Sequence, residues 1–155
     1  MTDRVVAHQG AACWATLFTH AHYLPCLAVL LQNMRACQTR YPLVVMVTET
    51  VDARTRERLT RMGCVLRDVD AWRVPHADGS LAFERFQNVW TKLRAFELYE
   101  YERVVMIDSD MLMCHNMDEL FDLPLERGMI AAALACTCNP KQIPTYPAEW
   151  TPRNC

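Results

Sequence analysis

The sequence predicts an α/β fold built on a mainly parallel sheet with flanking helices. Short apolar runs rich in β-branched residues alternate along the chain with segments that carry an apolar stripe at helical spacing. The run Leu43–Thr48 is apolar almost without interruption, which is typical of a parallel strand covered on both faces. A later apolar run leads directly into Asp108-Ser109-Asp110, as expected where parallel strands deliver polar residues to their carboxyl ends.

The first half of the chain is predicted to alternate two strands with two helices. We expect the first strand over Ala11–Thr19, an apolar stretch that ends in a polar loop. A helix should follow, because one apolar stripe recurs at i, i+3, i+4 and i+7, at Leu27, Leu30, Leu31 and Met34. Pro25 stands near its front, where a first helical turn tolerates proline. After the strand Leu43–Thr48, a second helix begins near Val51, and Gly63 can cap its end.

The second half continues the alternation. A weaker third strand is predicted over Cys64–Val69, followed by a long loop to about residue 82. The next helix is expected over Asn88–Tyr99, with its apolar stripe at Val89, Leu93 and Phe96. A fourth strand is expected over Val104–Ile107, just before Asp108.

Beyond the fourth strand the pattern weakens. We expect a short acidic helical turn over Asn116–Asp122 and a further apolar strand over Met129–Ala135. Residues 136–155 contain four of the eight prolines and no periodic segment, so we expect an irregular tail. The sequence therefore predicts one incomplete domain over residues 1–155, truncated on its C-terminal side.

Composition excludes several classes of partner. The chain has 155 residues, 52% of them hydrophobic, and its 16 Lys and Arg against 18 Asp and Glu give a net charge of −2. No general basic field is available, so we expect neither nucleic acid nor a membrane as a partner. No apolar run reaches the length of a membrane span. Most of the eight cysteines lie in apolar runs, where a thiol acts as a small hydrophobe, so we expect a cytoplasmic protein with reduced cysteines.

The residues Asp108 and Asp110 form the candidate metal site. Two carboxylates that follow one buried strand face the same region, where they repel each other unless a cation lies between them. Hard oxygen ligands select Mg²⁺ or Mn²⁺, and such an ion keeps positions open for a diphosphate. The alternative is a structural one, in which Asp108-Ser109-Asp110 is a turn that caps a helix.

A cationic pair is predicted beside these carboxylates. Lys92 lies on the flank of the expected apolar stripe, which holds its ammonium near the sheet, where a phosphate can be bound. If the helix begins slightly early, Arg85 shares the same face. The alternative is a lysine whose stem lies along the apolar surface, together with an unrelated surface arginine.

Three segments resemble the glycogenin and galactinol synthase branch of glycosyltransferase family 8. They are residues 86–98 (FQNVWTKLRAFEL), 101–110 (YERVVMIDSD) and 116–122 (NMDELFD), and residues 14–19 with Tyr23 are similar to that family's first strand and nucleotide loop. The resemblance implies a GT-A (Rossmann-like) fold for nucleotide-diphospho-sugar transferases. It also implies transfer of glucose or galactose from UDP-glucose or UDP-galactose with Mn²⁺ (or Mg²⁺), with retention of anomeric configuration. The acceptor would be a sugar, a polyol or a protein, and a homodimer is one assembly to expect.

The same resemblance implies roles for single residues. Asp108 and Asp110 would bind the metal and act in catalysis together with Lys92, while Lys92 and Arg85 would attend the donor sugar and diphosphate. The remaining donor contacts would come from Leu17 on the base, Thr19 and Tyr23 beside the uracil and ribose, and the backbone of Ser109. The chain departs from the family at His20, where relatives often have Asn. It also lacks the family's later His-x-x-Gly-x-x-Lys-Pro-Trp segment, which supplies a third metal ligand.

Two other functions compete with this hypothesis. One is a nucleotide-sugar-binding fragment without turnover, which would follow if the acceptor half is missing. The other is a haloacid-dehalogenase-like phosphatase, in which the first Asp of an Asp-x-Asp motif is a nucleophile. That motif normally ends the first strand of its fold, whereas here at least three predicted strands precede the strand that leads into Asp108.

Overall fold

The computed structural model describes residues 12–72, 89–126, 128–134, 138–144 and 146–153. The chain divides into two units, Met1–Leu123 and Pro124–Cys155. The first unit contains the sheet and all the described helices and strands, and the second is irregular. Among the described residues, no helix combines the length and the apolar character that crossing a membrane requires.

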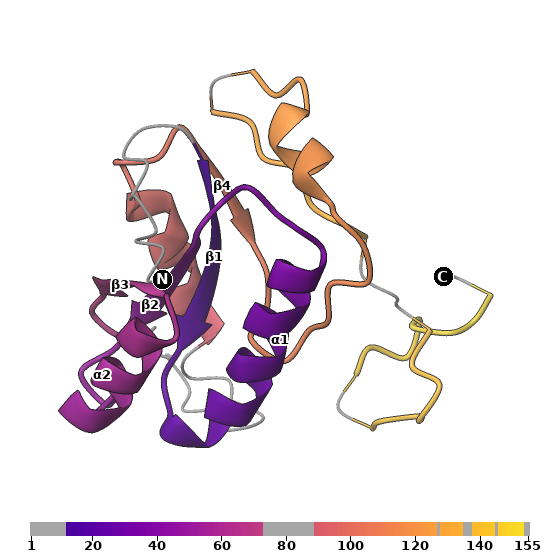
Figure 1. The fold of residues 1–155 in the computed structure, drawn as a ribbon. Coiled ribbons are helices and arrows are strands. Elements are labelled where there is room, and N and C mark those ends of the chain that lie inside the picture. Colours follow the sequence, from indigo (N-terminus) through magenta and orange to yellow (C-terminus); the bar gives the residue numbers. More distant parts are fainter. Residues whose placement is uncertain (1–11, 73–88, 127, 135–137, 145, 154–155) are drawn as a thin grey trace. The chain divides into compact units, whose positions relative to one another are not determined.

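A four-stranded parallel sheet forms the centre of the first unit (Figure 1). Its strands are β1 (Ala12–Phe18), β2 (Leu43–Val47), β3 (Val65–Asp68) and β4 (Arg103–Met106). They are arranged in the order β3-β2-β1-β4, and every neighbouring pair is parallel. The predicted α/β fold with a parallel sheet is therefore confirmed; each of the four strands ends one residue earlier than expected, and β4 also begins one residue earlier.

The two central strands are buried on both faces, as the uninterrupted apolar runs predict. On one face, alternate residues of β1 and β2 pack against α1 (Leu24–Ala36) and α2 (Ala53–Arg61). Helix α1 buries the predicted stripe, at Leu27, Leu30, Leu31 and Met34. On the other face, Cys13, Ala15, Val44 and Met46 pack against residues that follow β3 in the chain. Helices thus flank both faces of the sheet (Figure 1).

Both ends of α2 are fixed by local sequence signals. Asp52 is the N-cap, and its carboxylate accepts a hydrogen bond from the Thr55 amide at 2.9 Å. Gly63 follows the helix with φ of +90°, a conformation that glycine adopts without strain. The amide of Gly63 donates to the Thr60 carbonyl and that of Cys64 to the Leu59 carbonyl, the paired bonds of a Schellman motif. The predicted glycine cap is confirmed.

The helix predicted over Asn88–Tyr99 forms, but its buried face is not the predicted one. The described part is η3 (Val89–Glu97), a 3-10 helix, in which Val89, Leu93 and Phe96 are all exposed. The buried residues are instead Thr91, Ala95 and the following Leu98. Small side chains meet small ones here, because η3 packs on the part of β1 that presents Cys13 and Ala15. Hydrophobicity favoured the large residues, whereas the close approach of η3 to the sheet requires the small ones.

The strand predicted over Met129–Ala135 is wrong over its described part. Residues 129–134 form no strand and are all exposed, with Leu134 fully so. A strand needs a neighbour for its backbone hydrogen bonds, and none of the described residues pairs with this run. Its centre, Ala131, Ala132 and Ala133, also has low strand propensity. The irregular tail is confirmed for the described residues after 137, which form turns only.

A buried hydrogen-bond network joins the sheet to the segment after β4. The Trp14 indole in β1 donates to the Thr39 hydroxyl at 2.9 Å, and that hydroxyl donates to Asp118 Oδ1 at 2.5 Å. Asp118 opens η4 (Asp118–Asp122), in the region of the predicted acidic turn. Its second oxygen accepts from the Arg40 amide at 2.9 Å, and the Asn116 amide side chain lies within 3.4 Å. Burial disfavours the charged form of Asp118, but these donors outweigh it and lower the pKa of its carboxyl group.

We predict that Asp118→Asn lowers the free energy of unfolding by about 1–3 kcal/mol at neutral pH, because one acceptor oxygen at this buried position becomes an NH₂ donor and part of the network loses its partner. A lowered pKa contributes stability above the unfolded value of about 3.9, and this contribution is lost as the pH falls through the folded pKa. The variant should therefore also lose less stability than the parent on acidification. Urea unfolding at neutral and acidic pH measures both effects, with the exposed Asp122→Asn as matched control. Equal loss in both variants would contradict the special role of Asp118.

Candidate functional site

The strand order reverses at one place in the sheet, between β1 and β4. From β1 the chain moves through β2 to β3 on one side, and then returns to place β4 on the other side of β1. In open α/β sheets, ligands bind outside the carboxyl ends of the strands at such a switch point. Here the two segments that leave these ends are the one after Phe18 and the one after Met106.

The register brings Asp108 to this point. Ala15 pairs with Met106, and the Ile107 amide donates to the Ala15 carbonyl at 2.9 Å. Continued by two residues, the same register brings Asp108 level with Leu17 near the end of β1. The Met111 amide then donates to the Asp108 carbonyl at 3.1 Å, which closes a turn that carries Ser109 and Asp110.

Lys92 and Asp108 meet in an ion pair. The Lys92 ammonium on η3 lies 2.5 Å from Asp108 Oδ1, so two residues 16 positions apart are joined at the carboxyl end of β4. Both side chains are 39% exposed. The Asp108 side chain therefore binds a cation rather than capping the turn that it begins, and Lys92 is held against the site rather than along the apolar surface. The ion pair joins two of the predicted site residues, and their roles toward a metal and a phosphate stay predictions.

Within the described part of the chain, the carboxylates of Asp108 and Asp110 have oxygen atoms without a partner. No described residue forms a hydrogen bond or ion pair with the exposed Asp110 side chain, and none donates to Asp108 Oδ2. Ser109 between them is buried. No group of three or more His, Cys, Asp or Glu side chains in the described part of the chain could hold a metal ion. Two carboxylates suit Mg²⁺ or Mn²⁺, which commonly take one or two protein carboxylates and complete their shell with phosphate and water.

The segment after β1 forms the other side of the switch point. Leu17 and Thr19 are partly buried, and the Thr19 carbonyl accepts a hydrogen bond of 2.7 Å from the Thr50 hydroxyl. That hydroxyl also bonds to Thr48, the residue after β2, at 2.7 Å. The threonines therefore fix the loop backbone. Sequence reasoning did not select Thr48 and Thr50, although a Thr-x-Thr pattern directly after a buried strand is visible in the sequence.

Three aromatic rings contact one another in this loop. The ring centroids of His20 and His22 are 5.4 Å apart and nearly parallel, and those of His22 and Tyr23 are 4.1 Å apart. All three side chains are exposed, within and just before η1 (Ala21–Tyr23). Sequence reasoning named Tyr23 and treated His20 as a departure, but it missed His22. The alternation His-x-His-Tyr within a tight 3-10 turn is the signal that could have found it.

Of the predicted site residues, the structure brings Lys92, Asp108, Ser109 and Asp110 together at the end of β4. Leu17, Thr19 and Tyr23 lie on or after the end of β1, the neighbouring strand. Arg85, the second cation expected beside Lys92, lies outside the described residues.

Comparison with known proteins supports a glycosyltransferase relationship. No protein-family model matches the chain. It is 30% identical over 138 residues to galactinol synthase 5 of Arabidopsis thaliana. The aligned region covers 88% of this chain and 41% of that protein. It is 34% identical over 109 residues to galactinol synthase 2 of Ajuga reptans. That alignment covers 70% of this chain and 37% of that protein. The chain thus spans about two fifths of the length of these curated relatives.

A solved structure shares the fold. The apo structure of the bifunctional glycosyltransferase WbbM matches with a TM-score of 0.54 and 20% sequence identity. The match covers 79% of this chain and 22% of that one. At this identity the likeness concerns the fold alone, and it agrees with a GT-A-like α/β sheet.

We predict that Lys92→Met changes the free energy of unfolding by less than about 1 kcal/mol, because a partly exposed ion pair contributes little to stability. The matched control is Arg61→Met, which removes the exposed Arg61–Glu57 pair of 3.4 Å. Urea unfolding of the two variants should give similar, small changes. A loss of several kcal/mol for Lys92→Met alone would assign the Lys92–Asp108 pair to the stability of the fold.

Proposed function

Because the chain is related in sequence to the galactinol synthases of glycosyltransferase family 8 and shares its fold with a glycosyltransferase, we propose that it acts in hexosyl transfer from a UDP-sugar. The donor is UDP-glucose or UDP-galactose, the cofactor is Mn²⁺ (or Mg²⁺), and the anomeric configuration is retained. The observation that carries the proposal is the ion pair between Lys92 and Asp108 at the carboxyl end of β4, with Asp110 two residues further along the chain.

The proposed roles follow from charge. Asp108 and Asp110 hold the divalent ion, which neutralises negative charge on the departing nucleoside diphosphate. The Lys92–Asp108 ion pair supports a role for the Lys92 ammonium in contacting the same phosphates. A fixed cation that faces the charge developed in the transition state is an effective form of electrostatic catalysis. Arg85 is proposed as the second cation for the donor sugar and diphosphate.

The segment after β1 is proposed to bind the nucleoside. Leu17, partly buried at the end of β1, packs against the base, while Thr19 and Tyr23 border the uracil and ribose. Tyr23 contacts His22 with an angle of 41° between the ring planes, so the loop offers exposed aromatic rings on which a planar base can pack. Ser109 contributes a backbone contact.

The competing functions receive less support. The phosphatase hypothesis needs Asp108 at the end of the first strand of its core, whereas β4 is the fourth strand and pairs with β1. Binding of a nucleotide-sugar without turnover is compatible with the same site, so binding and transfer need separate measurements. The acceptor is proposed to be a sugar, a polyol or a protein.

We also propose a cytoplasmic location and include a homodimer among the assemblies to be tested. The location is supported by the thiols of Cys13, Cys26, Cys37, Cys64 and Cys114, none of which forms a disulfide. Burial raises the pKa of Cys13 to about 12 and that of Cys64 to about 11, so these thiols stay protonated and unreactive at neutral pH. They behave as core residues.

We predict that UDP and Mn²⁺ together raise the melting temperature of the chain, whereas either alone raises it little. At a ligand concentration of about 100 times Kd, the added stability is about 2.7 kcal/mol. Asp110→Asn should abolish this gain, and Lys92→Met should weaken it, because the first removes a metal ligand and the second a phosphate-facing cation.

The exposed Asp122→Asn serves as a matched carboxylate control and should behave like the parent. An equal shift in parent and Asp110→Asn would place the metal elsewhere and reject the proposed site. Transfer is measured separately, by release of UDP from UDP-galactose or UDP-glucose in the presence of sugar and polyol acceptors. Phosphatase activity that is abolished by Asp108→Asn and insensitive to UDP would favour the phosphatase instead.

A further inference from the structure

Three arginines of α2 line one hollow on the surface of the first unit. Arg54, Arg58 and Arg61 surround a volume of about 410 Å³ together with Met62. The three arginines are exposed and recur at i, i+4 and i+7, so they form a single row along the helix. At a rise of about 1.5 Å per residue, this arginine row spans about 10 Å.

A fourth guanidinium group lies at the edge of the same hollow. Arg35 belongs to α1, the helix beside α2, and donates a hydrogen bond to the carbonyl of Met62 (Figure 1). Gly63 leaves space for this contact, since a Cβ atom at that position would lie 3.2 Å from Arg35 Nη2. Arg35 is exposed as well. Four cationic side chains from two helices therefore gather around one hollow.

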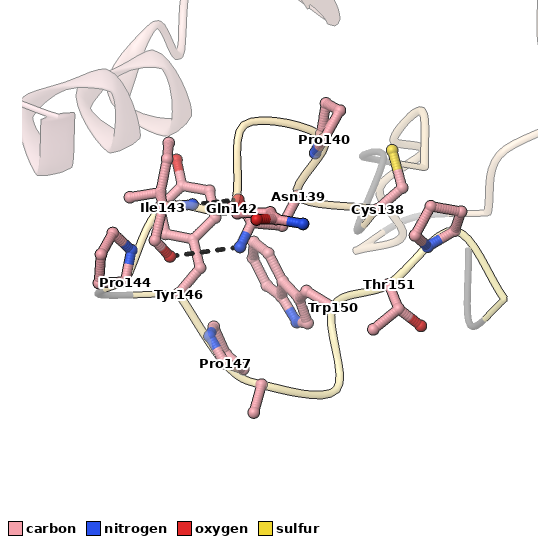
Figure 2. A pocket seen from close by; sticks show the side chains of 12 residues that line it. Cys138, Asn139, Pro140, Gln142, Ile143, Pro144, Tyr146, Pro147, Trp150 and Thr151 are labelled. Carbon is pink, nitrogen blue, oxygen red and sulfur yellow. Dashed lines mark hydrogen bonds between the residues drawn. The ribbon is translucent and has the colours of Figure 1, made fainter.

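This concentration of positive charge is local. The chain has a net charge of −2, yet four of its 16 Lys and Arg fall within residues 54–61. Another pocket of similar volume, about 400 Å³, lies between Cys138 and Pro152, and none of the described residues that line it is charged (Figure 2). Of these two, only the hollow on α2 can attract a ligand by charge, and it attracts anions.

The stability of α2 does not account for the arginine row. Arg56, on the same helix, is held by two backbone carbonyls and by Asp68. By contrast, no described residue binds the side chain of Arg54 or Arg58, and Arg61 has an exposed ion pair of 3.4 Å within the helix. Like charges at i and i+4 destabilise a helix, and a cation in its first turn opposes the helix dipole. The row therefore costs stability while its donors stay open to a partner.

We propose that the arginine row docks an acidic segment of a partner protein in an extended conformation. Guanidinium groups bind carboxylates through paired, charge-assisted hydrogen bonds. In an extended chain, alternate side chains share a face and lie about 6.7 Å apart. This spacing is close to the rise of about 6 Å from Arg54 to Arg58 along α2. An acidic segment can therefore place successive carboxylates on successive arginines.

Other anionic ligands fit the hollow less well. Small-molecule sites are lined mainly by apolar side chains, whereas three of the four residues that line this hollow are arginines. Strong binding of nucleic acid draws on many phosphate contacts over a long basic surface. The arginine row is short, and it belongs to a chain of negative net charge. A short acidic peptide matches its length and charge.

The test measures binding of a fluorescein-labelled octaglutamate peptide to the full chain by fluorescence anisotropy, without nucleotide or metal. Arg54→Gln combined with Arg58→Gln removes two cations and keeps the helix propensity of the segment. We expect this double variant to weaken binding about tenfold or more. Its melting temperature should be unchanged or higher, because two like charges on one helix are removed.

The matched control is Lys141→Gln combined with Arg153→Gln, which removes two exposed cations outside α2. This control should change Kd by less than about twofold, because the peptide is held by local contacts rather than by net charge. Equal weakening in the two double variants would overturn the proposal, and so would the absence of saturable binding to the parent chain.

Unlabelled tripolyphosphate and a single-stranded oligonucleotide serve as competitors. Displacement of the peptide by either one at a lower concentration than by unlabelled octaglutamate would make the arginine row a phosphate site and would overturn the proposal. A lower melting temperature of the Arg54 and Arg58 double variant would assign the row to the stability of α2, with the same consequence. Neither nucleotide nor metal takes part, so the result does not depend on the proposed hexosyl transfer.

Discussion

The pairing of β4 with β1 is the constraint on which the candidate site depends. β1 is the only described strand that directly connects the half of the sheet formed by β2 and β3 with the strand added on the opposite side. Its residues Cys13, Trp14 and Ala15 are almost completely buried, so its position is fixed from both faces. The register between β1 and β4 therefore determines the position of Asp108, which follows β4. The packing of η3 against Ala15 likewise determines the position of Lys92. Lys92 and Asp108 meet because the elements that position them, η3 and β4, both pack against β1.

Aspartates in this chain acquire different roles from their surroundings. Asp118 is buried, and hydrogen bonds from Thr39, Arg40 and Asn116 occupy its oxygens, so its charge is already satisfied within the fold. Asp108 has one oxygen on Lys92, while Asp110 is exposed without a partner among the described residues. A carboxylate with filled oxygens can only stabilise, whereas one with open oxygens can bind a cation. The burial and hydrogen bonding of each carboxylate therefore distinguish Asp118 from Asp108 and Asp110, which the sequence shows only as acidic residues.

Sequence patterns predicted the fold well where burial alone decides the structure. The strands, the α1 stripe and the Gly63 cap follow from hydrophobic periodicity and backbone conformation, which are local properties. The buried face of η3 could not be predicted in this way, because it depends on the small residues that β1 presents to it. The strand predicted over Met129–Ala135 was wrong for a related reason, because a strand needs a hydrogen-bonded neighbour that its own sequence does not specify. The Lys92–Asp108 contact was only partly predictable: both residues were selected, but their direct pairing is a tertiary property.

The small number of carboxylates at the switch point has a thermodynamic consequence. In the proposed metal site, Asp108 and Asp110 would leave most positions around a six-coordinate ion to water or to a ligand, because one Asp108 oxygen is already paired with Lys92. The affinity of such a site for the metal must therefore come in large part from oxygens of a bound diphosphate. By linkage, the metal increases the affinity for the diphosphate by the same factor. The proposed site therefore predicts positive cooperativity between metal and nucleotide, with Lys92 partly neutralising the carboxylates when both ligands are absent.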